Sequence, residues 1–304
     1  MTTRSAAPRG AGSHLSQCGA LPDLDTGARC WVAPRSLVGM LGAWLGAGRE
    51  AEVHAWGADA VVKMYRRGFG GHRSEAEALA ALDGHGVAPR LIDVVDLDGR
   101  TGLVLERLDG SDMLALLLGQ PWRVRGLART LAEAHRVIHR VQAAPGLPDL
   151  RQVLASRIED AALTPQLRGF ALRVLDGLPS GDRLCHGDYH PGNVLVAADR
   201  VTVIDWTGAA RGVPEADHAR TLLLLRWTDP LPGTPLTSRG LIWAGRGMLT
   251  NAYTRTYARN SNRPLRQVNS WLVVHIAARL SEGIDVERPR LTNLLDRAWR
   301  QAPR

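Results

Sequence analysis

A short hairpin flanked by polar side chains constrains this chain more than any other feature. The apolar runs 194–196 and 201–204 are separated by a turn at 197–200, so we predict two antiparallel strands. Asn193 directly precedes the first strand, and Asp205 directly follows the second. Paired strands lie roughly 5 Å apart, which would bring these two side chains across from each other. An amide oxygen and a carboxylate are suitable ligands for one Mg²⁺ ion.

The loop before this hairpin supplies a candidate base. Asp188 lies five residues upstream of Asn193, where its side chain can face the same point. Phosphoryl transfer requires a carboxylate that accepts the proton of the attacking hydroxyl, metal ligands that neutralise the phosphates, and a cation on the nucleotide. We assign the first role to Asp188, the second to Asn193 and Asp205, and the third to Lys63.

Lys63 is the only lysine among 38 basic residues, the rest being arginine. A lysine in an arginine-rich background indicates a position where a planar guanidinium cannot replace the compact ammonium. The residue lies in the second of two predicted strands, 52–56 and 60–65, which are joined by a turn at 57–59. This context favours a binding role over that of a solvated surface lysine.

The chain divides into a small mixed part and a larger helical part. Residues 1–35 lack sustained periodicity, and we predict a disordered tail. Residues 36–108 contain the predicted strands and a helix that Ser74 can cap, whereas the pattern of residues 109–304 is mainly helical. We therefore predict an α+β fold with two lobes: a small N-terminal nucleotide-binding lobe of sheet plus helix, and a larger, mainly helical C-terminal lobe that binds the acceptor.

Two motifs carry a resemblance to a known family. CHGDYHPGN at residues 185–193 and VIDW at residues 203–206 resemble the catalytic loop and metal-binding aspartate of the aminoglycoside phosphotransferase family. That family is related to choline and homoserine kinases and, more distantly, to protein kinases. The resemblance covers about residues 41–226 and implies a protein-kinase-like fold, ATP and Mg²⁺ as cofactors, and Asp188 as the catalytic base. Protein kinases have arginine at the position of Gly187, so the chain is more similar to the small-molecule kinases.

The same resemblance implies further roles around the two lobes. Lys63 would bind the α- and β-phosphates, and Glu75 on the following helix would be its partner, with Glu77 as the alternative. Asn193 and Asp205 would ligate magnesium. Asp217 resembles a structural aspartate that holds the catalytic region rather than a catalytic residue.

The adenine and glycine-loop assignments also rest on this resemblance. Backbone groups of Glu106 and Leu108 would meet adenine in the hinge between the lobes. Gly46 and Gly48 stand where the glycine-rich loop is expected. The turn lacks the third glycine of a protein-kinase loop, and a lone G-x-G also occurs in many ordinary turns.

The charge distribution bears on the acceptor. The net charge of +8 comes entirely from residues 206–304, with fifteen arginines against seven acidic residues, while residues 1–205 carry 23 of each sign. Aminoglycosides are polycations, which bind best to carboxylate-lined pockets. We therefore predict a small-molecule hydroxyl acceptor, an antibiotic or metabolite, that is not a strongly polycationic aminoglycoside.

Other functions stay open. The same site could phosphorylate serine or threonine in a peptide. A pseudokinase-like regulatory module that binds nucleotide is disfavoured because Lys63, Asp188, Asn193 and Asp205 are all present. A nucleic-acid-binding protein is supported only by the pI near 10.3 and by no binding motif.

The remaining composition points to a cytoplasmic protein that does not enter a membrane. No stretch approaches the about 18 consecutive apolar residues needed to span a bilayer, and the first residues lack a secretory signal. The three cysteines have no metal-ligand spacing. The sequence does not predict an oligomeric state.

Overall fold

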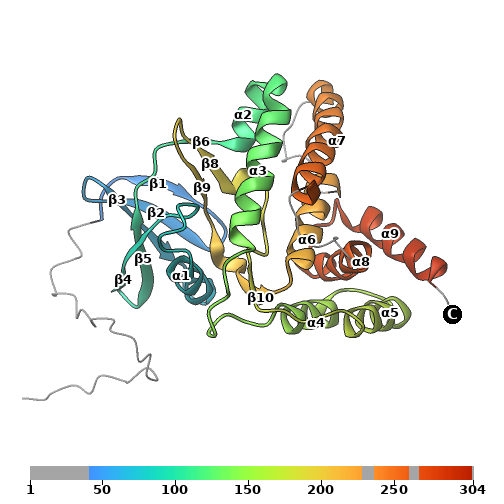
Figure 1. The fold of residues 1–304 in the computed structure, drawn as a ribbon. Helices are drawn as coiled ribbons and strands as arrows, with labels where there is room; N and C mark the ends of the chain where they lie inside the picture. The colour runs from blue at the N-terminus through green and yellow to red at the C-terminus, as the bar shows by residue number, and fades with distance from the viewer. Residues whose placement is uncertain (1–40, 228–235, 260–266, 303–304) are drawn as a thin grey trace, which may run out of the picture. The chain divides into compact units, whose positions relative to one another are not determined.

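The computed structural model describes residues 41–227, 236–259 and 267–302, with only the backbone described for residues 236–244. The predicted tail at residues 1–35 lies outside these ranges. Figure 1 shows strands β1–β5 and helix α1 at one end of the described chain, and helices α2–α9 beyond them.

A five-stranded antiparallel sheet forms the N-terminal part of the described chain, with the strand order β1-β2-β3-β5-β4. Its strands are β1 (Trp44–Ala47), β2 (Ala51–Trp56), β3 (Ala60–Tyr65), β4 (Leu91–Leu97) and β5 (Arg100–Glu106). The predicted strand pair around the turn at 57–59 is confirmed. Lys63 pairs with Val53 on β2 and Leu103 on β5, so its backbone is fixed on both sides by central strands.

Helix α1 (Gly71–Ala81) packs against the short 3₁₀ helix η4 (Trp206–Gly208), which follows Asp205. The prediction that Ser74 caps α1 is wrong. The helix begins before Ser74, its N-cap is Gly70, and no side chain caps it. The backbone already closes the first turn through the Arg73 amide, which donates to the Gly70 carbonyl at 3.3 Å.

The rest of the described chain is mainly helical, as predicted. Its helices are α2 (Met113–Gly119), η2 (Pro121–Arg123), α3 (Val124–Ile138), α4 (Leu150–Asp160), α5 (Pro165–Asp176), α6 (Pro214–Trp227), α7 (Leu236–Arg259), α8 (Val268–Arg279), η5 (Leu280–Glu282) and α9 (Arg288–Gln301). Among these described helices, none is both long and apolar enough to cross a membrane.

The catalytic segment forms two small sheets between α5 and α6. Strands β8 (Val194–Val196) and β9 (Val201–Val203) pair with each other, and β6 (Ser111–Asp112) pairs with β8. Strand β7 (Arg183–Cys185) pairs with β10 (Ala210–Gly212), and the 3₁₀ helix η3 (Pro191–Asn193) directly precedes β8. The predicted hairpin is confirmed. The Ile204 amide donates to the Asn193 carbonyl at 2.9 Å, so the two ends of the hairpin meet.

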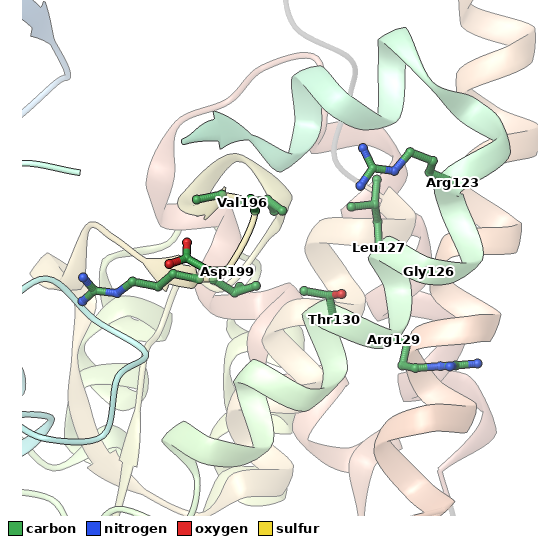
Figure 2. Close-up of a pocket in the computed structure, with 11 residues that line it drawn as sticks. Arg123, Gly126, Leu127, Arg129, Thr130, Val196 and Asp199 are labelled. Atoms are coloured by element: carbon green, nitrogen blue, oxygen red, sulfur yellow. The ribbon is translucent and has the colours of Figure 1, made fainter. Parts of the chain in front are cut away.

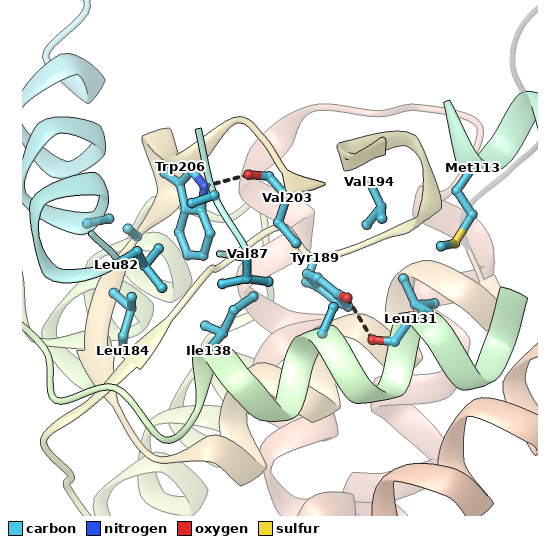
Figure 3. Close-up of a cluster of buried hydrophobic side chains, with 14 of the residues drawn as sticks. Leu82, Val87, Met113, Leu131, Ile138, Leu184, Tyr189, Val194, Val203 and Trp206 are labelled. Carbon is cyan, nitrogen blue, oxygen red and sulfur yellow. Dashed lines mark hydrogen bonds between the residues drawn. The ribbon is translucent and has the colours of Figure 1, made fainter. Parts of the chain in front are cut away.

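A buried apolar cluster lies beneath this hairpin (Figure 3). Trp206 and Tyr189 are fully buried within it, and each aromatic side chain also satisfies its polar atom. The Trp206 indole donates to the Val203 carbonyl at 3.0 Å, and the Tyr189 hydroxyl donates to the Leu131 carbonyl at 2.7 Å. These bonds connect the catalytic loop and η4 to strand β9 and helix α3.

Candidate active site

Lys63 bridges two carboxylates from distant parts of the chain. Its ammonium lies 2.6 Å from Glu75 Oε2 and 2.9 Å from Asp205 Oδ1. Burial alone would lower the pKa of Lys63, but the neighbouring carboxylates outweigh it and raise the pKa above its ordinary value. The side chain therefore stays charged. Glu77, the alternative partner, lies against Gly146 instead.

Glu75 is held by more than Lys63. The Tyr65 hydroxyl donates to Glu75 Oε2, and the Trp206 backbone amide donates to Oε1 at 3.4 Å. Tyr65 is a site residue that the sequence analysis missed. The available signal was its position two residues after Lys63, because alternate residues of a strand share one face.

Asp205 has an unusual backbone conformation. Its φ of 66° lies in the left-handed region, which is uncommon for any residue other than glycine and costs on the order of 1–3 kcal/mol. This conformation turns the chain from β9 into η4. The Asp205 side chain contacts the Lys63 ammonium through one carboxylate oxygen and is 45% exposed. Part of the carboxylate therefore remains available to a ligand.

Asn193 and Asp205 provide a donor set that suits Mg²⁺. The Asn193 side-chain amide donates to the Asp188 carbonyl at 2.9 Å, which leaves its amide oxygen as the atom available to a cation. A carboxylate oxygen and an amide oxygen are hard ligands of the kind that Mg²⁺ takes alongside phosphate and water. The residues therefore fit the magnesium ion that the sequence analysis predicted.

Asp188 is half-exposed and has two basic neighbours. Arg220 Nη2 lies 3.2 Å from Asp188 Oδ1, and His190 Nε2 lies 3.6 Å from Asp188 Oδ2. Burial would raise the pKa of Asp188, but His190 and Arg220 outweigh it and hold the pKa below its usual value. Arg220 was missed by the sequence analysis, because no motif links this residue of α6 to the catalytic loop.

Asp217 holds the backbone of the catalytic loop from below. Its carboxylate accepts the His186 amide at 2.6 Å and the Gly187 amide at 2.9 Å. His135 and His139 on α3 donate to the same carboxylate at 3.0 and 3.1 Å. Burial would raise the pKa of Asp217, but these imidazole donors hold it well below the usual value. Removing a charge from such a buried network costs roughly 3–5 kcal/mol.

These three side chains also have the composition of a metal site, since their ligand atoms lie within 4.8 Å of one another. Both histidines, however, already donate to Asp217, and their other ring nitrogens meet the hydroxyls of Tyr253 and Tyr257. The cluster is therefore satisfied as a hydrogen-bond network that supports the loop.

Gly187 is required by the packing of this loop. Its φ is +80°, and a Cβ at this position would lie 2.2 Å from the Gly208 carbonyl oxygen. No larger residue fits without moving the backbone. This contact gives a physical reason for glycine where protein kinases have arginine.

A chain of ion pairs continues from Arg220 away from Asp188. Arg220 Nη2 contacts Glu282 at 2.9 Å, and Glu282 in turn contacts Arg279 at 2.5 Å. Arg279 also binds Glu287 through two hydrogen bonds of 2.9 and 3.1 Å. Glu282 in η5 and Glu287 just before α9 are therefore both paired with arginines.

The predicted hinge and glycine turn have less distinctive surroundings. Glu106 ends β5, and its carboxylate binds Arg200 of the hairpin turn at 2.5 Å. With Leu108 it lines a hollow of about 110 Å³ beside the hairpin. Gly46 and Gly48 lie in β1 and in the turn after it, where a Cβ would meet no close contact. The adenine and glycine-loop roles of these residues stay predictions.

Figure 2 shows a larger hollow, of about 570 Å³, whose lining includes neither Lys63 nor Asp188. It is bounded by the start of α3 and by the turn of the β8–β9 hairpin. Its lining includes Arg123 at the end of η2, Leu127 and Thr130 on α3, and Val196 and Asp199 on the hairpin. None of the predicted site residues contributes to it.

A comparison with protein families shows the family to which the chain belongs. The model of the APH phosphotransferase enzyme family matches residues 45–259, which include Lys63, Asp188, Asn193 and Asp205. The chain belongs to the phosphotransferase enzyme family. It is accordingly an enzyme that transfers a phosphoryl group to an alcohol acceptor. Among curated proteins, no sequence matches this phosphotransferase.

Solved structures with the same fold include several kinases. Amicoumacin kinase hAmiN in complex with AMP-PNP, Ca²⁺ and Ami has a TM-score of 0.62 at 15% identity, and the match covers 88% of this phosphotransferase and 92% of that chain. A choline/ethanolamine kinase family protein from Mesorhizobium loti has a TM-score of 0.61 at 17% identity, covering 89% and 92% of the two chains.

A thermostable mutant of aminoglycoside phosphotransferase APH(4)-Ia has a TM-score of 0.60 at 15% identity, covering 85% of this phosphotransferase and 93% of that chain. At these identities the comparisons show the fold alone. They confirm the predicted α+β, kinase-like architecture with a sheet-bearing N-terminal part and a mainly helical C-terminal part.

Proposed function

We propose that the protein transfers the γ-phosphate of MgATP to a hydroxyl of a small molecule that is not strongly polycationic. The observation that carries this proposal is the convergence of three segments at one point. Lys63 of β3 binds both Glu75 of α1 and Asp205 at the end of the hairpin, while Asn193 at the other end binds the backbone of Asp188. Related structures in complex with AMP-PNP or ADP support ATP as the donor.

Each residue has a role that its surroundings support. Lys63 binds the nucleotide phosphates, and Glu75 with its Tyr65 contact keeps the ammonium oriented. Asn193 and Asp205 hold Mg²⁺, which neutralises phosphate charge when bound. Asp188 accepts the proton of the attacking hydroxyl, and its lowered pKa keeps it ionised before it does so. Its half-exposed carboxylate is accessible to an acceptor.

Most of the acidic residues after position 205 are poorly disposed to bind a polycation, the exception being Glu215, which is half-buried in the first turn of α6. Asp217 is buried, and Glu282 and Glu287 are paired with Arg279. The Asp285 side chain is 91% exposed and faces Arg288, and Asp296 pairs with Arg300. Asp229, which the sequence analysis counted with them, lies outside the described residues. Carboxylates that already have arginine partners offer little to an aminoglycoside.

The test is ADP release with MgATP across a panel of hydroxyl compounds that includes kanamycin-type aminoglycosides. Asp188→Asn should lower turnover by about 10²- to 10⁴-fold, the loss typical of a general base, and leave AMP-PNP binding nearly intact. Asp176→Asn, an equivalent change at the end of α5 where the side chain is 93% exposed, is the matched control and should behave as wild type.

Two results would contradict the proposal. Turnover that is unchanged in Asp188→Asn would refute the assigned base. Rapid turnover of kanamycin-type substrates at micromolar concentrations would refute the prediction about the acceptor. A peptide substrate, if phosphorylated faster than every small molecule in the panel, would favour the peptide kinase alternative.

A further inference from the structure

Arg220 has more hydrogen-bond donors than partners. Its side chain is 5% exposed, and its Nη2 atom binds both Asp188 at 3.2 Å and Glu282 at 2.9 Å. A guanidinium has five N–H donors. Within the described residues the buried Nε has no partner, which leaves part of a buried cation unsatisfied. Such a group is costly unless something binds to it.

Arg157 of helix α4 is a second arginine near the same point. It lies three residues after Leu154 and seven after Leu150, on the face of α4 that is buried against α8 and η5. Glu282 of η5 is the residue that Arg220 binds. Arg157 itself is half-buried, and the part of the chain that the structure describes offers its guanidinium no hydrogen bond or ion pair.

The electrostatic surroundings of Arg157 agree with this location. Burial lowers the pKa of Arg157, and the charge of Arg220 lowers it further, whereas Glu282 and Asp188 raise it. These are the charges of the cluster around η5, where α4 packs and where Arg220 binds Glu282. Two neighbouring guanidiniums with unused donors favour an anion between them.

The nearby carboxylates cannot supply that anion. Glu282 is shared between Arg220 and Arg279, and Glu287 is bound through two hydrogen bonds to Arg279. Asp188 is the remaining carboxylate, and Arg220 already pairs with it at 3.2 Å.

We propose that Arg157 and Arg220 bind a carboxylate group of the acceptor, close to the hydroxyl that becomes phosphorylated, so that the substrate class is a hydroxy acid. This inference rests on the proposed function. The acceptor oxygen forms a bond to the γ-phosphorus, the bond from that phosphorus to the bridging oxygen breaks to release ADP, and the hydroxyl proton passes to Asp188. The carboxylate takes no part in bond making and serves to orient the acceptor.

The transferred phosphoryl group is a less suitable partner for this pair. Among the described residues, the contacts of Lys63 are Glu75 and Asp205, and neither carboxylate is bound by Arg157 or Arg220. The arginines instead approach the base, which must contact the acceptor hydroxyl. An effect of Arg157 on acceptor binding without an effect on nucleotide binding separates the two possibilities.

The experiment uses the full chain and a panel of short hydroxy carboxylates, each matched with its own primary amide. ADP release and AMP-PNP affinity are measured for wild type, Arg157→Gln and the control variant Arg173→Gln. Arg173 is an exposed arginine on α5, so its replacement removes the same charge. Arg157→Gln should raise KM for the preferred carboxylate by about 10-fold or more, the effect of losing a charged hydrogen bond. Its turnover of amides and its AMP-PNP affinity should match those of wild type.

A second variant guards against a folding defect. Arg157→Lys keeps the charge and should recover part of the preference for carboxylates, and melting temperatures establish that each variant is folded. If Arg157→Gln does not fold, the deciding value is the ratio of KM for carboxylates to KM for amides in Arg157→Lys. A ratio equal to that of wild type overturns the proposal.

The outcomes separate this inference from the proposed function. Faster wild-type turnover of amides or of cationic acceptors than of carboxylates overturns the inference but leaves the phosphotransferase assignment intact. The inference is also overturned if wild type and Arg157→Gln have the same kinetics with every carboxylate. The same holds if neither protein turns over any carboxylate. Failure of AMP-PNP to bind, together with an absence of ADP release from any acceptor, would instead overturn the proposed function.

Discussion

The two sides of the candidate site differ in which charged groups have fewer partners than they can bind. On the nucleotide side, the single ammonium of Lys63 meets two carboxylates, Glu75 and Asp205. On the acceptor side, Arg220 and Arg157 have donors that the nearby carboxylates leave unused. The first arrangement suits a metal cation that carries phosphate, and the second suits an anionic group. In the two proposals above, a magnesium-bound phosphate completes the first side and an acceptor carboxylate completes the second.

The largest effect is expected when a negative charge is removed from the nucleotide side. Asp205→Ala should abolish the dependence of AMP-PNP binding on Mg²⁺ and weaken binding in its presence by at least about 100-fold, because a direct metal ligand is lost. Binding titrations with and without EDTA measure the effect. Asp176→Ala at the end of α5, where the side chain is 93% exposed, is the control. Magnesium-dependent binding that survives in Asp205→Ala would show that the metal is held elsewhere.

A smaller effect is expected when Lys63, on the nucleotide side, is replaced by a residue of the same charge and a different shape. Lys63→Arg introduces a wide planar guanidinium between contacts of 2.6 and 2.9 Å, so it should disturb both pairs. We expect kcat/KM for ATP to fall by about 10- to 100-fold, corresponding to the loss of one charged hydrogen bond. Steady-state kinetics with ATP as the varied substrate test this.

The matched control is Arg66→Lys, the reverse change at an exposed position just after β3, which should leave kcat/KM near that of wild type. Wild-type kinetics in Lys63→Arg would mean that only the charge matters at this position. The size constraint inferred from the arginine-rich composition would then be wrong.

The mildest test concerns the buried histidines below the acceptor side. Burial lowers the pKa of His135 and of His275 to about 3, so both stay neutral in the folded protein. In the unfolded chain their pKa is near 6.5, so the unfolded state binds more protons between about pH 6.5 and 3. The free energy of unfolding should therefore fall as pH decreases through this window, by up to about 1.4 kcal/mol per pH unit for each histidine.

Urea unfolding between neutral pH and pH 5 measures this slope. His275→Gln should reduce the slope, because one of the depressed pKa values is removed, whereas His85→Gln at an exposed position should leave it unchanged. A free energy of unfolding that does not change over this range would contradict the neutral state of these histidines.

Local patterns predicted part of the site well. The hairpin could be derived because both strands and their turn lie within residues 194–204, and antiparallel pairing fixes which ends meet. The choice between Glu75 and Glu77 was harder, since both lie within one turn of α1. Only the packing of α1 against η4 turns Glu75 toward Lys63.

The error at Ser74 has a similar origin. Serine is a good N-cap, but Gly70 begins this helix, and the first turn is closed by backbone bonds alone. A capping preference is worth only about 1 kcal/mol, which tertiary packing readily overrides. Helix boundaries therefore follow from contacts that the local sequence does not contain.

By itself, the sequence determined the chemistry available to this protein: one lysine, a hairpin with an amide and a carboxylate at its ends, and an aspartate in the preceding loop. These features depend on residues near one another in the chain, so their relative positions follow from strand and turn geometry. The tertiary structure decided which distant charges meet. Arg220 reaches Asp188, and α4 brings Arg157 to the same part of the protein, only because α4, α6 and η5 all pack against α8, and that packing is a property of the whole core.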